Sequence, residues 1–131
     1  MNIRDVARDY GLKLVFVTEN NIDGLAKKYD VERDVLLKNA VVLDDADILL
    51  GIFDDQEIRR AVFFHEIGHT LVTQYYQRLV HDDTMFIEYQ AWIEAFKIAK
   101  KYHYVFTKKV FKYVLRAIQS YYKDALHAYN V

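Results

Sequence analysis

The segment His65-Glu66-Ile67-Gly68-His69 places two imidazoles and one carboxylate at the spacing His-Glu-x-x-His. On a helix that turns about 100° per residue, the two histidines lie about 40° apart and one turn from each other, so both can reach one metal ion. Glu66 projects about 100° away from His65, close enough to accept a proton from a metal-bound water. The motif therefore predicts a metal-dependent hydrolytic site with Glu66 as the general base.

The surroundings of the motif support a metal rather than an accident of composition. Apolar residues flank it, and an imidazole pair buried with a carboxylate but without partners would be costly. The alternative is that His65 and His69 are hydrogen-bonded core residues and that Glu66 is solvated. Gly68 costs on the order of 1 kcal/mol in a helix relative to alanine, which indicates a close approach at this face, either by a neighbouring helix or by a ligand.

A third ligand is needed, because catalytic zinc sites commonly have three protein ligands and one open position. The chain has no cysteine, and no further histidine follows at a three-histidine spacing, which leaves a glutamate. On a helical wheel, small and apolar residues that include Ala91 lie within about 60° of Glu88. Glu94 falls at about 240°, on the side that carries Lys97 three residues later. This comparison predicts Glu88 as the ligand, with a core carboxylate held by a tyrosine as the alternative.

The elements that must position these groups follow from periodicity and from turn residues. The order is α-β-α-β-β-α-α-α, with helices predicted over 2–10, 22–29, 54–80, 85–102 and 107–129 and strands over 12–18, 35–43 and 48–53. Gly11 is expected to stop the first helix, Asp54 to cap the long helix, and residues 81–84 to separate it from the next. There is no proline and no linker-like tract, so residues 1–131 form one α+β domain.

Composition and charge narrow the class of protein. With 53% hydrophobic and 28% charged residues, the chain is of ordinary globular type. It shows no apolar run of about 18 residues and no leader pattern, and its lack of cysteine suits a cytoplasmic protein. Residues 98–131 hold seven Lys or Arg against Asp124 alone, whereas residues 1–97 are acidic. The two halves can neutralise each other, or the basic end can contact nucleic acid or an acidic protein.

His65-Glu66-Ile67-Gly68-His69, followed after eighteen residues by Glu88, resembles the zincins of gluzincin type, and most closely the small ImmA/IrrE-type metallopeptidases of bacteria, phages and mobile elements. The resemblance covers about residues 35–102. It implies a minimal zincin core in which His65, His69 and Glu88 hold Zn²⁺ and Glu66 is the base. It also implies an endopeptidase whose protein substrate is often a DNA-binding repressor. The family's sequence pattern around its third ligand is matched more closely by Glu94-Ala95-Phe96-Lys97-Ile98-Ala99, so Glu94 stays the alternative third ligand.

The sequence also suggests a substrate-binding strand, additional proton donors and two alternative functions. In zincins a strand before the metal helix commonly receives the substrate backbone, which makes residues 48–53 the candidate strand. Additional proton donors could come from His81, His103, Tyr75 or Tyr76. A module that binds a protein partner without peptidase activity is one alternative. A protein that contacts nucleic acid through its basic last helix is another, with Lys and Arg on phosphates and Tyr113, Tyr121 and Tyr122 on bases.

Overall fold

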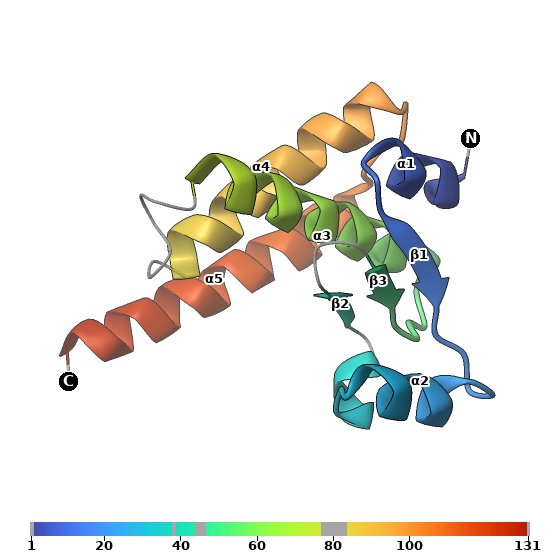
Figure 1. Cartoon of the computed structure of the whole chain (residues 1–131). Coiled ribbons are helices and arrows are strands. Elements are labelled where there is room, and N and C mark those ends of the chain that lie inside the picture. Colours follow the sequence, from blue (N-terminus) through green and yellow to red (C-terminus); the bar gives the residue numbers. More distant parts are fainter. Residues whose placement is uncertain (1, 38, 44–46, 77–83, 131) are drawn as a thin grey trace.

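The computed structural model describes residues 2–37, 39–43, 47–76 and 84–130 as five α-helices, one 3₁₀ helix and three strands (Figure 1). In chain order they are α1 (Ile3–Asp9), β1 (Lys13–Phe16), α2 (Ile22–Tyr29), η1 (Arg33–Leu36), β2 (Ala40–Leu43), β3 (Asp47–Leu50), α3 (Gln56–Tyr76), α4 (Thr84–Lys101) and α5 (Lys108–Asn130). This confirms the predicted α+β class and the order of the main elements. None of the described helices is long and apolar enough to cross a membrane.

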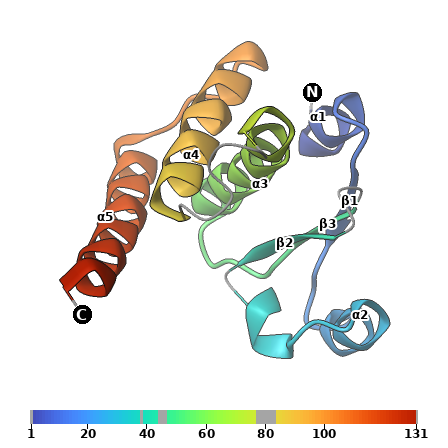
Figure 2. The ribbon, with the colours of Figure 1, turned by 60° about the vertical axis from the view of Figure 1, so that its left-hand side comes forward.

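The three strands form a mixed sheet in the order β1-β3-β2, with β3 parallel to β1 and antiparallel to β2. Side chains alternate between the two faces, as the period of a strand requires. Leu14, Ile48 and Leu50 join the larger core with α1, α3, α4 and α5. Val15 and Leu49 belong to the smaller core with α2 and η1. Helices therefore cover both faces, and α3, which carries the motif, lies on one of them (Figure 2).

All three strands are shorter than predicted, and β1 occupies only Lys13–Phe16 of the predicted 12–18 segment. Residues 33–36 form η1, and β2 occupies only Ala40–Leu43 of the predicted 35–43 segment. The buried Leu36 directs its carbonyl to the N–H of Ile52 at 3.1 Å, and the Asn39 carbonyl accepts from the N–H of Gly51 at 2.8 Å. A side chain at Gly51 would meet both of these carbonyls. The predicted 48–53 strand consequently ends at Leu50, where the chain passes under η1.

Asp55, rather than the predicted Asp54, caps the start of α3. Its Oδ1 accepts from the N–H groups of Glu57 and Ile58, at 2.9 and 3.1 Å. The cap lies one residue later than expected because Asp55 directly precedes the first helical residue. Lys109 of α5 also contacts Asp55, at 2.6 Å, and so joins the beginnings of the two helices. The structure describes α3 as far as Tyr76. Of the predicted break at 81–84, residues 81–83 lie outside the described residues, and Thr84 is already the first residue of α4.

Close contact between α3 and α4 depends on Gly68. A Cβ built at Gly68 would meet the carbonyl oxygen of Ala91, with the Ala91 Cα at 3.2 Å. Of the two explanations for a glycine in this helix, the structure supports packing against a neighbouring helix. The same packing brings the start of α4, which carries Glu88, next to the histidines on α3.

Candidate metal centre

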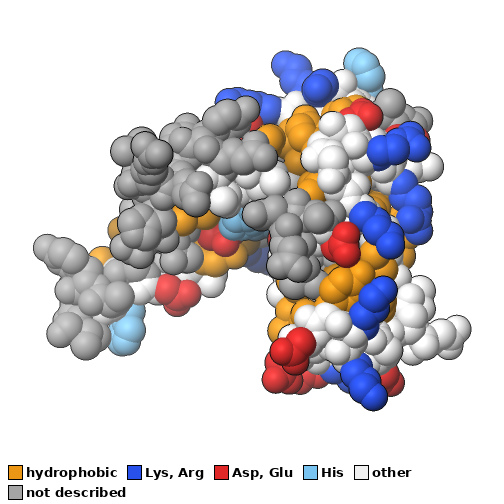
Figure 3. All heavy atoms as spheres, in the orientation of Figure 1, with side chains coloured by type: hydrophobic (Ala, Val, Ile, Leu, Met, Phe, Trp, Pro, Cys, Tyr) orange, Lys and Arg blue, Asp and Glu red, His pale blue; other side chains and the backbone are white. Residues whose placement is uncertain are grey.

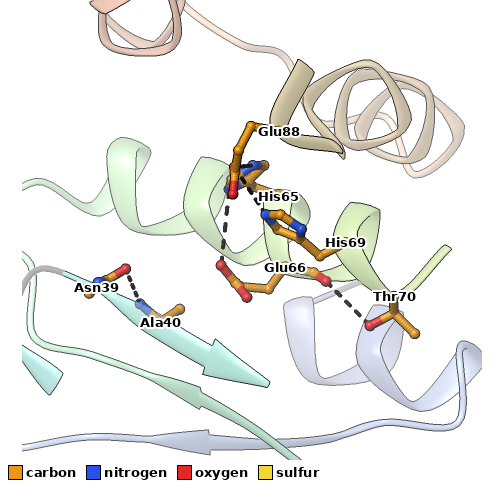
Figure 4. Close-up of polar contacts among 7 residues, drawn as sticks. All are labelled: Asn39, Ala40, His65, Glu66, His69, Thr70 and Glu88. Atoms are coloured by element: carbon orange, nitrogen blue, oxygen red, sulfur yellow. Dashed lines mark hydrogen bonds and ion pairs between the residues drawn. The ribbon is translucent and has the colours of Figure 1, made fainter. Parts of the chain in front are cut away.

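His65 and His69 lie one turn apart on α3, and Glu88 reaches them from α4 (Figure 4). Glu88 Oε2 is 2.9 Å from His65 Nε2 and 3.1 Å from His69 Nε2. His65 is buried, and His69 and Glu88 are largely buried. One ligand atom from each residue lies within 4.8 Å of the others. Two nitrogens and one carboxylate oxygen therefore converge from two helices on one point.

The donor set fits a zinc ion. Zinc takes histidine nitrogens and carboxylate oxygens at about 2.0–2.2 Å, so donors at tetrahedral angles lie about 3.3–3.5 Å from each other. The separations of 2.9 and 3.1 Å from Glu88 Oε2 are only slightly shorter. His65 Nε2 is buried and, despite this proximity, makes no hydrogen bond of acceptable geometry. A cation would satisfy a buried nitrogen that the protein itself leaves without a hydrogen bond.

The pKa values of Glu88, His65 and His69 depend on one another. Burial opposes ionisation of Glu88, but its close contacts with the His65 and His69 imidazoles outweigh burial and lower its pKa to about 2. Burial lowers the pKa of His65. Burial acts in the same direction on His69, yet its hydrogen bond to Glu88 and the nearby carboxylates raise its pKa overall. Glu88 is therefore an ionised carboxylate that stabilises positive charge at this point.

Glu66 occupies a separate position beside the cluster. Its Oε1 is 4.0 Å from His65 Nδ1, and burial is the main cause that raises its pKa to about 7. Glu66 and His69 line a hollow of about 350 Å³ together with Thr70 and Thr73 of α3 and residues 40–42 of β2. Histidine and acidic side chains reach the surface near the centre of Figure 3, beside the notch that separates α5 from the sheet. Glu66 thus borders a space that is open to a ligand between α3 and β2.

Trp92 stacks on the ring of His65, a contact that was not predicted from the sequence. The indole stacks on the imidazole with centroids 4.0 Å apart and planes 9° from parallel. Trp92 lies four residues after Glu88, so the two share one face of α4. That spacing was the available signal, but an apolar residue on the buried face of a helix is by itself no sign of contact with a metal ligand. It fixes the orientation of one candidate ligand.

Tyr121 of α5 is a second residue whose role was missed. Its pKa is raised to about 12 by burial and then by the nearby Glu88 carboxylate, with which its hydroxyl interacts. In the sequence it was grouped with Tyr113 and Tyr122 as a base-stacking candidate. No local pattern links it to Glu88, because the contact depends on how α5 crosses α4. Tyr113 is also turned inward, against Trp92 with centroids 6.3 Å apart, whereas Tyr122 is exposed.

Comparison of the chain with protein-family models, curated proteins and solved structures finds no match. The geometry of the site is therefore the basis for a functional proposal.

The other predicted residues have separate positions. Glu94 pairs with Lys97 at 3.3 Å, the i+3 partner that the sequence suggested, and it does not belong to the ligand cluster found among the described residues. His103 lies in the loop between α4 and α5 with a φ of 64°, where it lines different hollows. His81 and the side chains of Tyr75 and Tyr76 lie outside the described part of the structure.

The prediction that residues 48–53 receive the substrate backbone was wrong. β3 forms the centre of the sheet, with β1 on one side and β2 on the other, so neither of its edges can accept another strand. The edge strand beside Glu66 is β2. Sequence order suggested β3 because it directly precedes α3, but strand pairing decides which edge is free.

Proposed function

We propose that this protein is a zinc-dependent metallopeptidase of the gluzincin type, which hydrolyses a peptide bond in a protein or peptide substrate. The observation that carries the proposal is the convergence of His65, His69 and Glu88 within 4.8 Å, with the largely buried Glu66 beside them. Two histidines and one glutamate form a common ligand set for catalytic zinc. When bound there, zinc would supply Lewis acidity to a coordinated water and to the substrate carbonyl.

Glu66 is suited to proton transfer. A catalytic base works best when its pKa lies near the working pH, and burial raises the pKa of Glu66 to about 7. Glu66 would accept the proton of the attacking water and later deliver it to the leaving amine. Its position on the hollow between α3 and β2 leaves it accessible to both groups. A zinc site with only a structural role would have no need of this carboxylate.

β2 is the proposed strand for substrate binding. The Leu50 carbonyl of β3 accepts from Val17, which shows that the backbone groups of Leu50 face β1. Its β2 partner Ala40 therefore points its N–H and C=O away from β3, and the Ala40 N–H donates to Asn39 Oδ1 at 2.9 Å (Figure 4). Val42, two residues later, presents its N–H and C=O to the same free edge. An extended peptide could pair there and pass Glu66.

The substrate class rests on the resemblance described above. Similarity to ImmA/IrrE-type peptidases makes a DNA-binding repressor a reasonable candidate, and a cytoplasmic location remains an expectation from the cysteine-free composition. A partner-binding module without peptidase activity is the competing function. The largely buried Glu66 favours the peptidase, because binding alone does not require a carboxylate with a pKa near neutrality.

Metal analysis and cleavage of a peptide library test the proposal together. We expect the purified wild-type protein to bind one equivalent of zinc and to cleave members of a proteome-derived peptide library, with the sites identified by mass spectrometry. His65→Ala and Glu88→Gln should lose zinc, whereas Glu94→Gln, the matched control on the same helix, should retain it. Glu66→Gln should retain zinc and lose cleavage. Equal cleavage by wild type and Glu66→Gln, or no cleavage by the zinc-loaded wild type, would contradict the peptidase proposal.

A further inference from the structure

Large exposed apolar side chains are concentrated on the hairpin of α4 and α5. Eight such residues occur in the described part of the chain, and all except Leu37 lie between residues 85 and 126. On the two helices they form a surface that we call the α4–α5 face: Met85, Tyr89, Phe111, Leu115, Tyr122 and Leu126. Single exposed apolar residues are ordinary, whereas a contiguous group marks an interaction site.

Most of the face is a row of side chains on α5, and Met85 and Tyr89 of α4 complete it. Phe111, Leu115, Tyr122 and Leu126 fall within about 60° of one another on α5. They are about half exposed, between 46% and 56%, although Val110 and Val114 of the same helix are buried. Figure 2 shows α4 and α5 side by side and running in opposite directions. Phe96 of α4 contacts Phe111 of the α5 row, with ring centroids 5.6 Å apart.

One end of the face is concave. Between the end of α4 and the start of α5 lies a hollow of about 610 Å³, lined by residues that include Phe96, Phe106 and Phe111. Val105, at 87% exposure, stands at this hollow. A concave aromatic site of this kind accommodates a large apolar side chain of a partner. An exposed apolar row that ends in such a hollow is suited to bind the apolar stripe of a helix.

The positive charge around the α4–α5 face indicates the charge that a partner should carry. Residues 98–131 contain seven Lys or Arg and only one acidic residue. Lys112, Arg116 and Lys123 follow one side of the apolar row of α5, about 100–140° around the helix from Phe111. Lys100 lines the aromatic hollow. A second copy of the chain would bring like charges together, whereas a partner with acidic flanks would complement them.

We propose that the α4–α5 face binds an amphipathic helix of a partner protein, with an apolar stripe flanked by Asp and Glu. The aromatic hollow favours a helix over an anionic membrane, because a flat bilayer surface does not fill a concave site. The residues of the face are distinct from His65, His69, Glu88 and Glu66. The inference therefore stands independently of the peptidase proposal, and its experiment does not use cleavage.

A designed pair of peptides provides the test. Both are labelled helices of about three heptads with leucine at positions a and d, and one carries Glu at e and g while the other carries Lys. Fluorescence anisotropy with the full chain should show the acidic peptide binding at least about tenfold more tightly than the basic one. Phe111→Ser combined with Leu115→Ser should weaken acidic-peptide binding by about tenfold or more. Leu37→Ser, which changes an exposed apolar residue elsewhere, should leave that binding unchanged.

Charge reversal and two controls make the result decisive. Lys112→Glu combined with Arg116→Glu should reverse the preference toward the basic peptide. All variants should retain the wild-type circular dichroism and zinc content, because the changed side chains are exposed. Equal affinity for both peptides, or no binding of either, overturns the proposal. It is also overturned if Phe111 and Leu115 are needed instead for binding to phosphatidylcholine–phosphatidylserine vesicles, or for a dimer detected by light scattering.

Discussion

Gly68 of α3 lies against the backbone carbonyl of Ala91 of α4, so that no side chain separates the two helices at this point. Ala91 follows Glu88 by three residues, less than one turn of α4. The distance between the helices at Gly68 therefore controls how far Glu88 reaches toward His65 and His69. A residue without a metal-binding group thus sets the geometry of the candidate metal centre.

Gly68→Ala is expected to destabilise the fold and to weaken metal binding. The gain in helix propensity is about 1 kcal/mol, whereas forcing a methyl group into a packed contact commonly costs about 1–3 kcal/mol. Gly24 is a matched control, because it lies in α2 with open space around its Cα. Gly24→Ala should raise stability by about 0.5–1 kcal/mol. Chemical denaturation and zinc titration of both variants measure these effects, and unchanged zinc affinity in Gly68→Ala would refute this role of the helix contact.

Trp92 should report metal binding directly. It is the only tryptophan of the chain, and its indole stacks on His65 at 4.0 Å. Binding of Co²⁺ or Cu²⁺ at His65 should therefore quench the intrinsic fluorescence in proportion to occupancy. His65→Ala should abolish the saturable quenching, while His103→Ala, a change in the α4–α5 loop, should leave it intact. Saturable quenching that persists in His65→Ala would place the metal elsewhere.

Acid stability of the metal-free protein should depend on Glu88. The pKa of Glu88 is lowered from 4.5 to about 2 in the folded chain, so its ionised form is favoured by folding. This contribution is fully present above pH 4.5 and is lost as pH falls toward 2. Melting temperatures of wild type and Glu88→Gln, measured with a chelator, should differ at pH 6 and converge toward pH 2. A difference that stays constant across this range would argue against the interaction with the two histidines.

Tyr121→Phe is expected to weaken zinc binding without unfolding the protein. The Tyr121 hydroxyl interacts with the Glu88 carboxylate, and loss of a group that orients a metal ligand typically costs about 10–100-fold in affinity. Tyr122→Phe, on the adjacent exposed residue, should leave zinc affinity at the wild-type value. Competition with a chromophoric chelator measures both constants. Equal affinities of the two variants would assign Tyr121 a packing role only.

Val42→Pro tests β2 as the substrate strand. Val42 directs its N–H away from β3, so proline there removes no bond of the β2–β3 pair, and an edge strand can accept it. We expect the variant to fold and bind zinc but to lose about tenfold or more in kcat/KM on the peptides that the wild type cleaves. Val42→Ala retains the N–H and controls for the lost packing. If Val42→Ala loses as much activity, pairing with the Val42 N–H is not required.

The sequence alone was sufficient for the features that depend on a few neighbouring residues. Helix periodicity fixed the spacing of His65 and His69, and the α+β class followed from the order of apolar patterns. The face of α4 that carries Glu88 was also identifiable, because Ala91 and its neighbours mark the buried side within one helix. The Glu94–Lys97 pair was predicted from i,i+3 spacing in the same way. Each of these follows from the geometry of a single helix or strand.

Only the tertiary structure decided the relationships between distant segments. It placed β3 at the centre of the sheet and left β2 as the free edge beside Glu66. It also brought Tyr121 to Glu88 and the Gly68 backbone to Ala91. Strand order and helix crossing depend on which apolar faces bury each other, and residues far apart in the sequence share no periodicity that encodes this choice. Local patterns named the candidate ligands, and long-range packing determined that they meet.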